Sequence, residues 1–262
     1  MVQWVAAGVV LPTWAATAQA QMALSAAINV SGSFRALSQR MAKAYCQQHL
    51  QVMPLAALDV LAKVRKQAQA GAADLAKGST AGAWPADLSR QLEEVQKQYT
   101  VLNTLTATAP SKASAAAVAE QADRMMTAAQ TATESLEKLA RARSAKLVDM
   151  AGRQRMLSQR MAKQYFLLAA GVDPKASQTQ MNADATELKQ ALQALAAAPV
   201  STPAIRTELE LGQAQWLFFE AAMRRHPDTK GMEAVATTSE RLLEVMDRLT
   251  SLYDAALREV LG

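Results

Sequence analysis

The 262-residue sequence has few of the residues that build reactive or cross-linked sites. Cys46 is the single cysteine, so an internal disulfide is excluded, and the two histidines do not stand at the spacing of a metal-binding pair. The sequence contains no glycine-rich phosphate loop and no nucleophile beside a matching base. We therefore predict a protein that is not an enzyme, with no catalytic residue, no cofactor and no metal site.

Glycine, proline and aromatic residues are also scarce: ten glycines, eight prolines and 5% aromatics. Valine-rich alternating runs are absent, whereas alanine, glutamine, leucine and methionine, which favour helices, are prominent. The composition therefore predicts an all-α protein. A net charge of +5 suits anionic ligands or acidic surfaces. The charge is too diffuse, and too poor in interleaved aromatics, to indicate nucleic-acid binding.

The first twenty residues have the pattern of an export signal. An apolar core over residues 4–11 is followed by Pro12 and by the small-x-small sequence Ala18-Gln19-Ala20. No lysine or arginine precedes this core, which departs from the usual signal pattern, and the core is shorter than the ~20 residues of a spanning helix. We predict a signal peptide at 1–20, cleaved after Ala20, and a periplasmic protein. No later segment is long and apolar enough to cross a bilayer.

One segment of the chain occurs twice. The heptapeptide Leu-Ser-Gln-Arg-Met-Ala-Lys spans residues 37–43 and recurs at 157–163. Subtracting 37 from 157 gives an offset of 120, and the same offset relates Gly32 to Gly152. Because seven identical residues at a fixed offset indicate an internal duplication, we predict two modules, residues 21–141 and 142–262.

Prolines and polar turns divide each module into four helices, which predicts two tandem four-helix bundles. Expected helices run from about 22 to 52, 55 to 76 and 86 to 106, with counterparts in the second copy. Between residues 111 and 170 there is no proline and one glycine. A continuous helix of ~60 residues would then join the modules end to end. The alternative is a fold-back near 141–146 that sets them side by side. The absence of a helix-breaking residue favours the continuous helix, and the fold-back remains the alternative.

Each motif helix carries an arginine on its apolar face. At ~100° per residue, Arg35 shares its face with small and apolar side chains, and so does Arg155 in the second copy. A guanidinium does not lose its proton, so its burial requires a negative partner. That partner is either a carboxylate, such as Glu120 or Asp123, or a bound anion. The residues alone leave both open.

The segment Ile-Asn-Val-Ser-Gly-Ser-Phe-Arg-Ala-Leu-Ser-Gln-Arg at 28–40 resembles the first-helix signature of NarX-type nitrate/nitrite sensor kinases. Both copies resemble more closely the PilJ-type domain, the N-terminal domain of type IV pili methyl-accepting chemotaxis transducers. The resemblance implies a periplasmic helical-bundle sensor module. In nitrate-sensing members, it implies that a first-helix arginine from each of two subunits grips the anion. That motif position is Arg35 in the first copy and Arg155 in the second.

The second copy departs from the first at two motif positions. Asp149 stands for Asn29, and Arg153 stands for Ser33. Because both changes alter charge near the motif arginine, we expect the ligand chemistry of the two copies to differ.

We therefore predict an exported sensor-type protein that binds a small oxyanion, nitrate or nitrite first. A planar oxyanion suits a guanidinium because two parallel N–H groups meet two coplanar oxygens. The alternative is a helical interaction protein without a small ligand. Expected partners are a membrane receptor, a sensor kinase or a pilus component, and a second copy in a homodimer. The predicted ligand-binding residues are Arg35, Arg155, Ser38, Gln39, Ser158, Gln159, Gly32 and Gly152.

Overall fold

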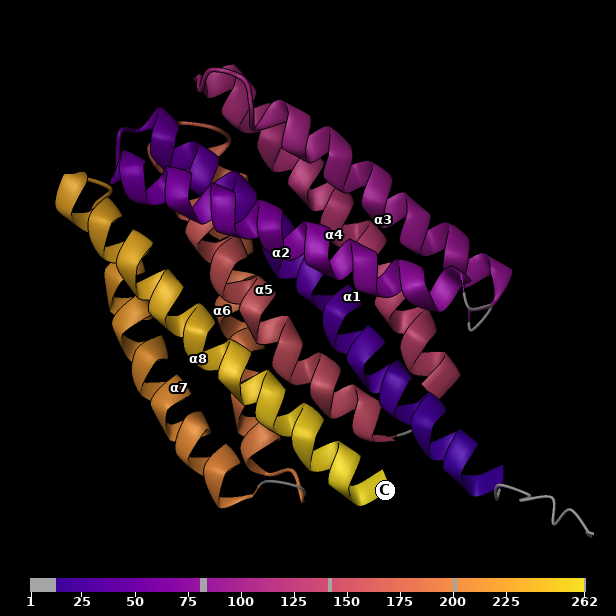
Figure 1. Ribbon diagram of the computed structural model, residues 1–262. Coiled ribbons are helices and arrows are strands. Elements are labelled where there is room, and N and C mark those ends of the chain that lie inside the picture. Colours follow the sequence, from indigo (N-terminus) through magenta and orange to yellow (C-terminus); the bar gives the residue numbers. More distant parts are fainter. Residues whose placement is uncertain (1–12, 81–83, 141–142, 200–201, 262) are drawn as a thin grey trace, which may run out of the picture.

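The computed structural model describes residues 13–80, 84–140, 143–199 and 202–261, which form eight α-helices and no strand (Figure 1). The all-α prediction is thus confirmed. The first module contains α1 (Thr13–His49), α2 (Pro54–Thr80), α3 (Ala86–Leu105) and α4 (Lys112–Ala140). The second contains α5 (Arg143–Ala169), α6 (Pro174–Ala196), α7 (Pro203–Met223) and α8 (Thr229–Leu261).

Local sequence signals set most helix starts. Helices α6 and α7 both begin at a proline, which needs no backbone N–H partner in the first turn. The side chain of Asp173 accepts a hydrogen bond from the Ala176 N–H, and that of Thr202 accepts one from the Ile205 N–H. These two caps satisfy backbone donors that the helices leave without internal acceptors.

The N-terminal helix starts earlier than expected. Helix α1 begins at Thr13 and runs through the predicted cleavage point after Ala20. The apolar core of the predicted signal peptide, residues 4–11, lies outside the described residues. None of the helices that the structure describes is long and apolar enough to cross a membrane.

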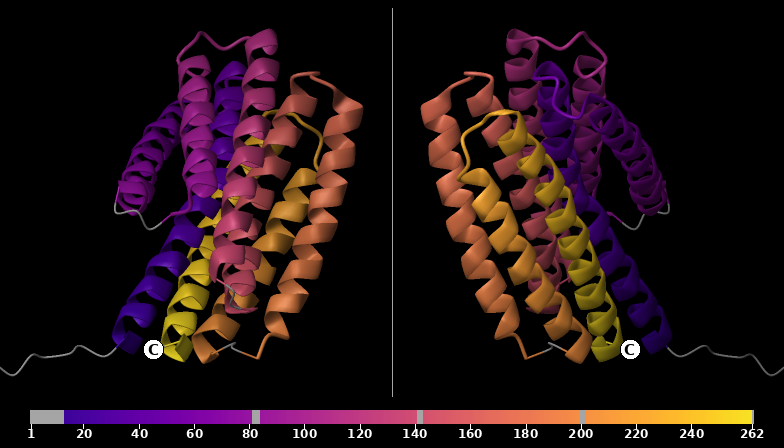
Figure 2. Two further views of the ribbon diagram at one scale, coloured as in Figure 1. Left: turned by 90° about the vertical axis from the view of Figure 1, so that its right-hand side faces the viewer. Right: turned by 90° about the vertical axis from the view of Figure 1, so that its left-hand side faces the viewer.

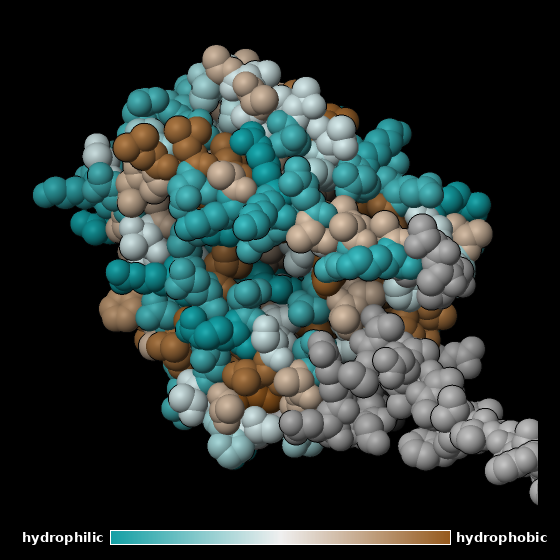
Figure 3. All heavy atoms as spheres, viewed as in Figure 1, coloured by the Kyte–Doolittle hydropathy of each residue, from teal (hydrophilic) through white to brown (hydrophobic). Residues whose placement is uncertain are grey.

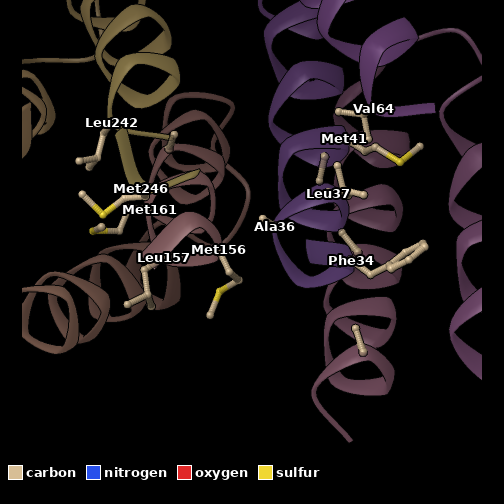
Figure 4. Close-up of a cluster of buried hydrophobic side chains, with 14 of the residues drawn as sticks. Phe34, Ala36, Leu37, Met41, Val64, Met156, Leu157, Met161, Leu242 and Met246 are labelled. Atoms are coloured by element: carbon tan, nitrogen blue, oxygen red, sulfur yellow. The ribbon is translucent and has the colours of Figure 1, made fainter. Parts of the chain in front are cut away.

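The buried apolar side chains of the two modules belong to one core cluster. Helix α1 packs against α2 and α4, and α4 packs against α3; the second module repeats these contacts with α5, α6, α8 and α7. Figure 4 shows side chains of this cluster from both modules. The first module contributes Phe34, Met41 and Val64, and the second contributes Met161, Leu242 and Met246. Cys46 is fully buried, and burial raises the pKa of its thiol to about 12, as expected for a packed thiol.

The two modules lie side by side, and α1 packs along α5 in the same direction (Figures 1 and 2). Helix α4 runs opposite to α5, so the expected continuous helix is wrong; the junction itself, 141–142, lies outside the described residues. The physical reason is the polar content of the motif faces. An end-to-end rod would leave the cations of α1 and α5 without the carboxylates that the other module supplies.

Buried ion pairs cross between the modules. The Lys43 side chain is fully buried in α1, and its ammonium pairs with Glu240 of α8. Lys163 is equally buried in α5, and its Nζ lies 2.6 Å from Asp123 Oδ1 of α4. The two pairs occupy equivalent positions in the duplication, since Asp123 aligns with Glu240. Burial lowers the pKa of both lysines, and the facing carboxylates oppose that shift.

We expect Glu240→Gln to destabilise the fold by about 3 kcal/mol at pH 7, because Lys43 then stays buried without a counter-charge. Although burial alone raises the pKa of Glu240, Lys43 and Arg40 lower it to about 2, from an ordinary value of 4.5. Its stabilisation is therefore complete above pH 4.5 and is lost as the pH falls towards 2.

Urea unfolding of wild type and Glu240→Gln at pH 7 and near pH 2 measures this loss. The difference between the two proteins should shrink at the lower pH. Glu233→Gln, on the exposed face of the same helix, is the matched control and should change little. A loss of the same size at both pH values would contradict the charge pairing.

Candidate functional site

Arg35 is enclosed where α1 meets α4 and α5. Its side chain is 1% exposed, and each guanidinium nitrogen has a partner. Nε donates to Gly32 O at 3.2 Å, Nη1 donates to Gln130 Oε1 at 2.6 Å, and Nη2 donates to Asp149 Oδ1 at 2.5 Å. A Cβ at position 32 would lie 2.8 Å from Nη2, so this close approach requires glycine. Every nitrogen of the Arg35 guanidinium therefore donates to a protein oxygen.

Arg155 has the same geometry on the other side of the seam. Nε donates to Gly152 O at 3.3 Å, Nη1 to Asp247 Oδ1 at 2.8 Å and Nη2 to Asn29 Oδ1 at 2.9 Å. A Cβ at position 152 would lie 3.0 Å from Nη2. Burial lowers the pKa of Arg155, and the charge of Asp247 opposes this shift. Each motif arginine thus donates a hydrogen bond to the other copy, Arg35 to Asp149 and Arg155 to the aligned Asn29.

Both amide partners lie in the first module, and both carboxylate partners lie in the second. On α1 and α5 the aligned residues are Asn29 and Asp149; on α4 and α8 they are Gln130 and Asp247, since 247 − 130 gives 117, the offset that also relates Asp123 to Glu240. Arg35 takes its carboxylate from the opposite module, whereas Arg155 takes its carboxylate from its own. Each arginine therefore has one carboxylate and one amide oxygen, and each positive charge is neutralised once.

The carboxylates expected from the sequence have other partners. Glu120 pairs with Arg124 on the same helix, and Asp123 pairs with Lys163. Sequence reasoning noted Asp149 as a departure but did not single out Asn29, Gln130 or Asp247. The signal that identifies them is that both aligned positions carry an amide in the first copy and an acid in the second.

The donor groups of the predicted serines and glutamines form hydrogen bonds with protein oxygens. The hydroxyls of Ser38 and Ser158 each donate to the carbonyl of the motif arginine, both at 2.8 Å. Gln39 Nε2 donates to Asp123 Oδ1 and Gln159 Nε2 donates to Ser239 O, both at 3.0 Å. The Oε1 atoms of both glutamines are buried and receive no hydrogen bond from the described residues. The atoms left over are acceptors, which an anion would not approach.

A cavity of about 540 Å³ opens beside Arg155, between α1, α2, α5 and α8. On the face shown in Figure 3, hydrophilic side chains surround this region. Four cations line the cavity, Arg40, Lys63, Lys66 and Arg155, against two carboxylates, Glu244 and Asp247. Its remaining lining residues are Ser33, Ala36, Leu37, Gln67 and Leu243.

The equivalent place on the other side of the seam is closed by an ion pair. Ser33 and Gln67 of the cavity align, at the offset of 120, with Arg153 and Glu187. Arg153 pairs with Glu187 and also donates from Nη1 to Gln130 Oε1 at 3.2 Å. On this closed side an ion-paired arginine and glutamate thus stand where the open side has Ser33 and Gln67.

Fold and site together define a duplicated helical bundle with one buried arginine site in each copy. The family model for the type IV pili methyl-accepting chemotaxis transducer N-terminal domain matches residues 16–125 and 139–242. The chain therefore belongs to this family, in two tandem copies, and the resemblance read from the motifs is confirmed. Nothing matched in the search of curated proteins or in that of solved structures. Family membership makes the chain a sensor module of the chemotaxis-transducer type.

A second carboxyl lies beside Asp149. Burial first, and then the charge of Asp149, raises the pKa of Glu137 to about 7 from an ordinary value of 4.5. Glu137 Oε1 is buried and receives no hydrogen bond from the described residues, so a proton on this carboxyl would let it donate to Asp149. The pair is most stable when it holds one proton, because two adjacent carboxylates repel each other.

We expect the stability of the protein to fall as the pH rises from about 4.5 to about 7, because the raised pKa means that ionising Glu137 costs more in the folded chain than in the unfolded chain. Glu137→Gln should remove this dependence, matching wild type at pH 4.5 and melting at a higher temperature at pH 8. Thermal melts across this range measure the effect. Glu120→Gln, at an exposed position of the same helix, is the control, and a wild-type profile in Glu137→Gln would refute the shared proton.

Proposed function

We propose that the chain is an exported sensor module that binds a small oxyanion, nitrate or nitrite first, at Arg155 in the open cavity. The observation that carries this proposal is that the motif arginine Arg155 lines an open cavity together with three further cations, Arg40, Lys63 and Lys66. On the closed side, Lys63 and Lys66 align with Ala183 and Thr186, which carry no charge. These two lining cations therefore have no counterpart on the closed side, where the added cation Arg153 is paired with Glu187.

The exposure of the competing carboxylates favours Arg155 over Arg35. An anion that binds the two terminal nitrogens of either arginine side by side competes with existing partners, since each of these nitrogens already donates to a protein oxygen. Asp247 is 62% exposed, so it can turn into water when an anion takes its place. Asp149 is 17% exposed and adjoins Glu137, so releasing it from Arg35 would leave an unpaired, partly buried charge. We therefore assign ligand contact to Arg155 and a positioning role to Arg35.

Anion binding at this place would act on the seam between the modules. Arg155 Nη2 holds Asn29 of α1, so a change in the orientation of the guanidinium reaches the neighbouring module directly. The family relationship suggests a receptor or a pilus-related component as partner. We propose that such a partner reads a small shift of α1 against α5.

A second candidate function is a helical interaction protein that binds no small ligand. The observation in its favour is that each motif arginine already has a carboxylate within 2.8 Å. The two candidates differ in one measurable property, which is the binding of an anion to the cavity.

Titration calorimetry of the purified protein with nitrate, nitrite, sulfate and chloride tests the proposal. We expect heat with nitrate or nitrite, and a loss of affinity of about 10- to 100-fold in Arg155→Met, as expected when a charged hydrogen-bond donor is removed. A more specific test is the double variant Ser33→Arg/Gln67→Glu, which introduces the ion pair of the closed side at the aligned positions of the open side. It should abolish binding while leaving helix content unchanged.

The matched control is Arg153→Ser/Glu187→Gln, which changes the same two positions on the other side and should leave the affinity of Arg155 unchanged. Heat that persists in the double variant Ser33→Arg/Gln67→Glu would place the anion elsewhere. No heat with any of the four anions would favour the interaction protein.

A further inference from the structure

Helix α7 has two apolar faces, and the bundle covers one of them. Residues such as Ile205, Leu209 and Phe219 face α6 and α8 and are buried. On the opposite face, Leu217 and Phe218 are each 63% exposed. Figure 1 shows α7 at the outer edge of the molecule. Its second face therefore has no partner among the described residues.

The exposed face has the spacing of a helix–helix seam. Large and small residues alternate at intervals of three and four: Leu211, Ala214, Phe218 and Ala221, all exposed. This is the a/d pattern of two-helix packing, in which side chains of one helix fill the spaces of another. Clusters of exposed apolar side chains of this kind mark interaction surfaces.

The order of large and small residues makes the face complementary to itself. If two copies of α7 pair in antiparallel fashion about a twofold axis at residue 216, position 211 meets 221 and position 214 meets 218. Leu211 of one copy then faces Ala221 of the other, and Phe218 faces Ala214. The same pairing brings Glu210 at one flank towards Arg224 of the other copy, a contact between opposite charges. A twofold interface requires this kind of match between a surface and itself.

The first module offers an internal comparison. Helix α3 is the counterpart of α7 at the offset of 117, and its aligned positions carry Glu94, Lys97, Val101 and Thr104. Three of these four residues are polar, and Val101 is 42% exposed. The apolar seam is therefore a property of α7 and not of the fold shared by both modules.

We propose that two copies of the chain associate through the exposed face of α7, in antiparallel orientation. This surface is distinct from the α1–α5 seam, which each chain already buries internally. A single pair of helices of about 31 Å (21 residues at 1.5 Å) is a small interface. The association is therefore reversible and depends on protein concentration. It does not depend on the oxyanion site.

Sedimentation velocity of the full chain over a range of concentrations tests the association. The wild type should shift from monomer to dimer as concentration rises. Phe218→Glu should weaken the dimer by about tenfold or more, as expected for a central aromatic anchor. Val101→Glu, at the aligned position of α3, is the control and should leave it unchanged. A wild type that stays monomeric throughout, or a dimer that tolerates Phe218→Glu, would overturn the proposal.

The orientation has its own test. Glu210→Arg should weaken the dimer, and Glu210→Arg/Arg224→Glu should restore it. Leu211→Cys and Ala221→Cys proteins should form a disulfide with each other when mixed, and not with themselves, because Cys46 is buried and like positions lie about 15 Å apart. Cross-linking of each single variant with itself would show parallel packing and refute the antiparallel seam.

Discussion

The neutralisation of buried cations along the α1–α5 seam decides the arrangement of the molecule. Arg35, Lys43 and Lys163 lie in the interior, and each obtains its carboxylate from the opposite module. A charge buried without a partner costs several kcal/mol, far more than one surface contact contributes. Neither module can therefore bury its motif helix alone, and the two copies must lie side by side. Packing of the small and apolar residues on the same faces follows from that placement.

The sequence predicted the local structure well because the relevant signals are local. Pro54 and Pro174 lie at the starts of α2 and α6, and the helix expected from about 86 to 106 agrees with α3. The arrangement of the modules was predicted wrongly because the sequence around 141–142 contains no breaker, and the chain nevertheless reverses between α4 and α5. The requirement that reverses it is tertiary: the carboxylates that face α1 come from α5 and α8.

The candidate site was predicted in part for the same reason. A helical wheel is enough to show that Arg35 and Arg155 face inwards, because it needs only the residues of one helix. Their partners require the register between helices, and the structure shows Asp149 and Asp247 rather than the acids nearest in the predicted bundle. The duplicated sequence does hold this information, because both partner positions carry an amide in the first copy and a carboxylate in the second. This pattern can be interpreted only when α1 and α5 are known to be neighbours.

Covalent duplication also explains how the two sides of the seam can differ. In a dimer of identical chains every substitution appears on both sides, so a residue that closes one cavity closes its twin. In this chain Arg153 and Glu187 close one side with an ion pair, while Ser33 and Gln67 leave the other open. The closed side gains a partly buried pair of opposite charges, and the open side keeps a cavity lined by Arg155. The asymmetry therefore follows from covalent duplication: each copy can change at an aligned position while the other copy keeps its residue.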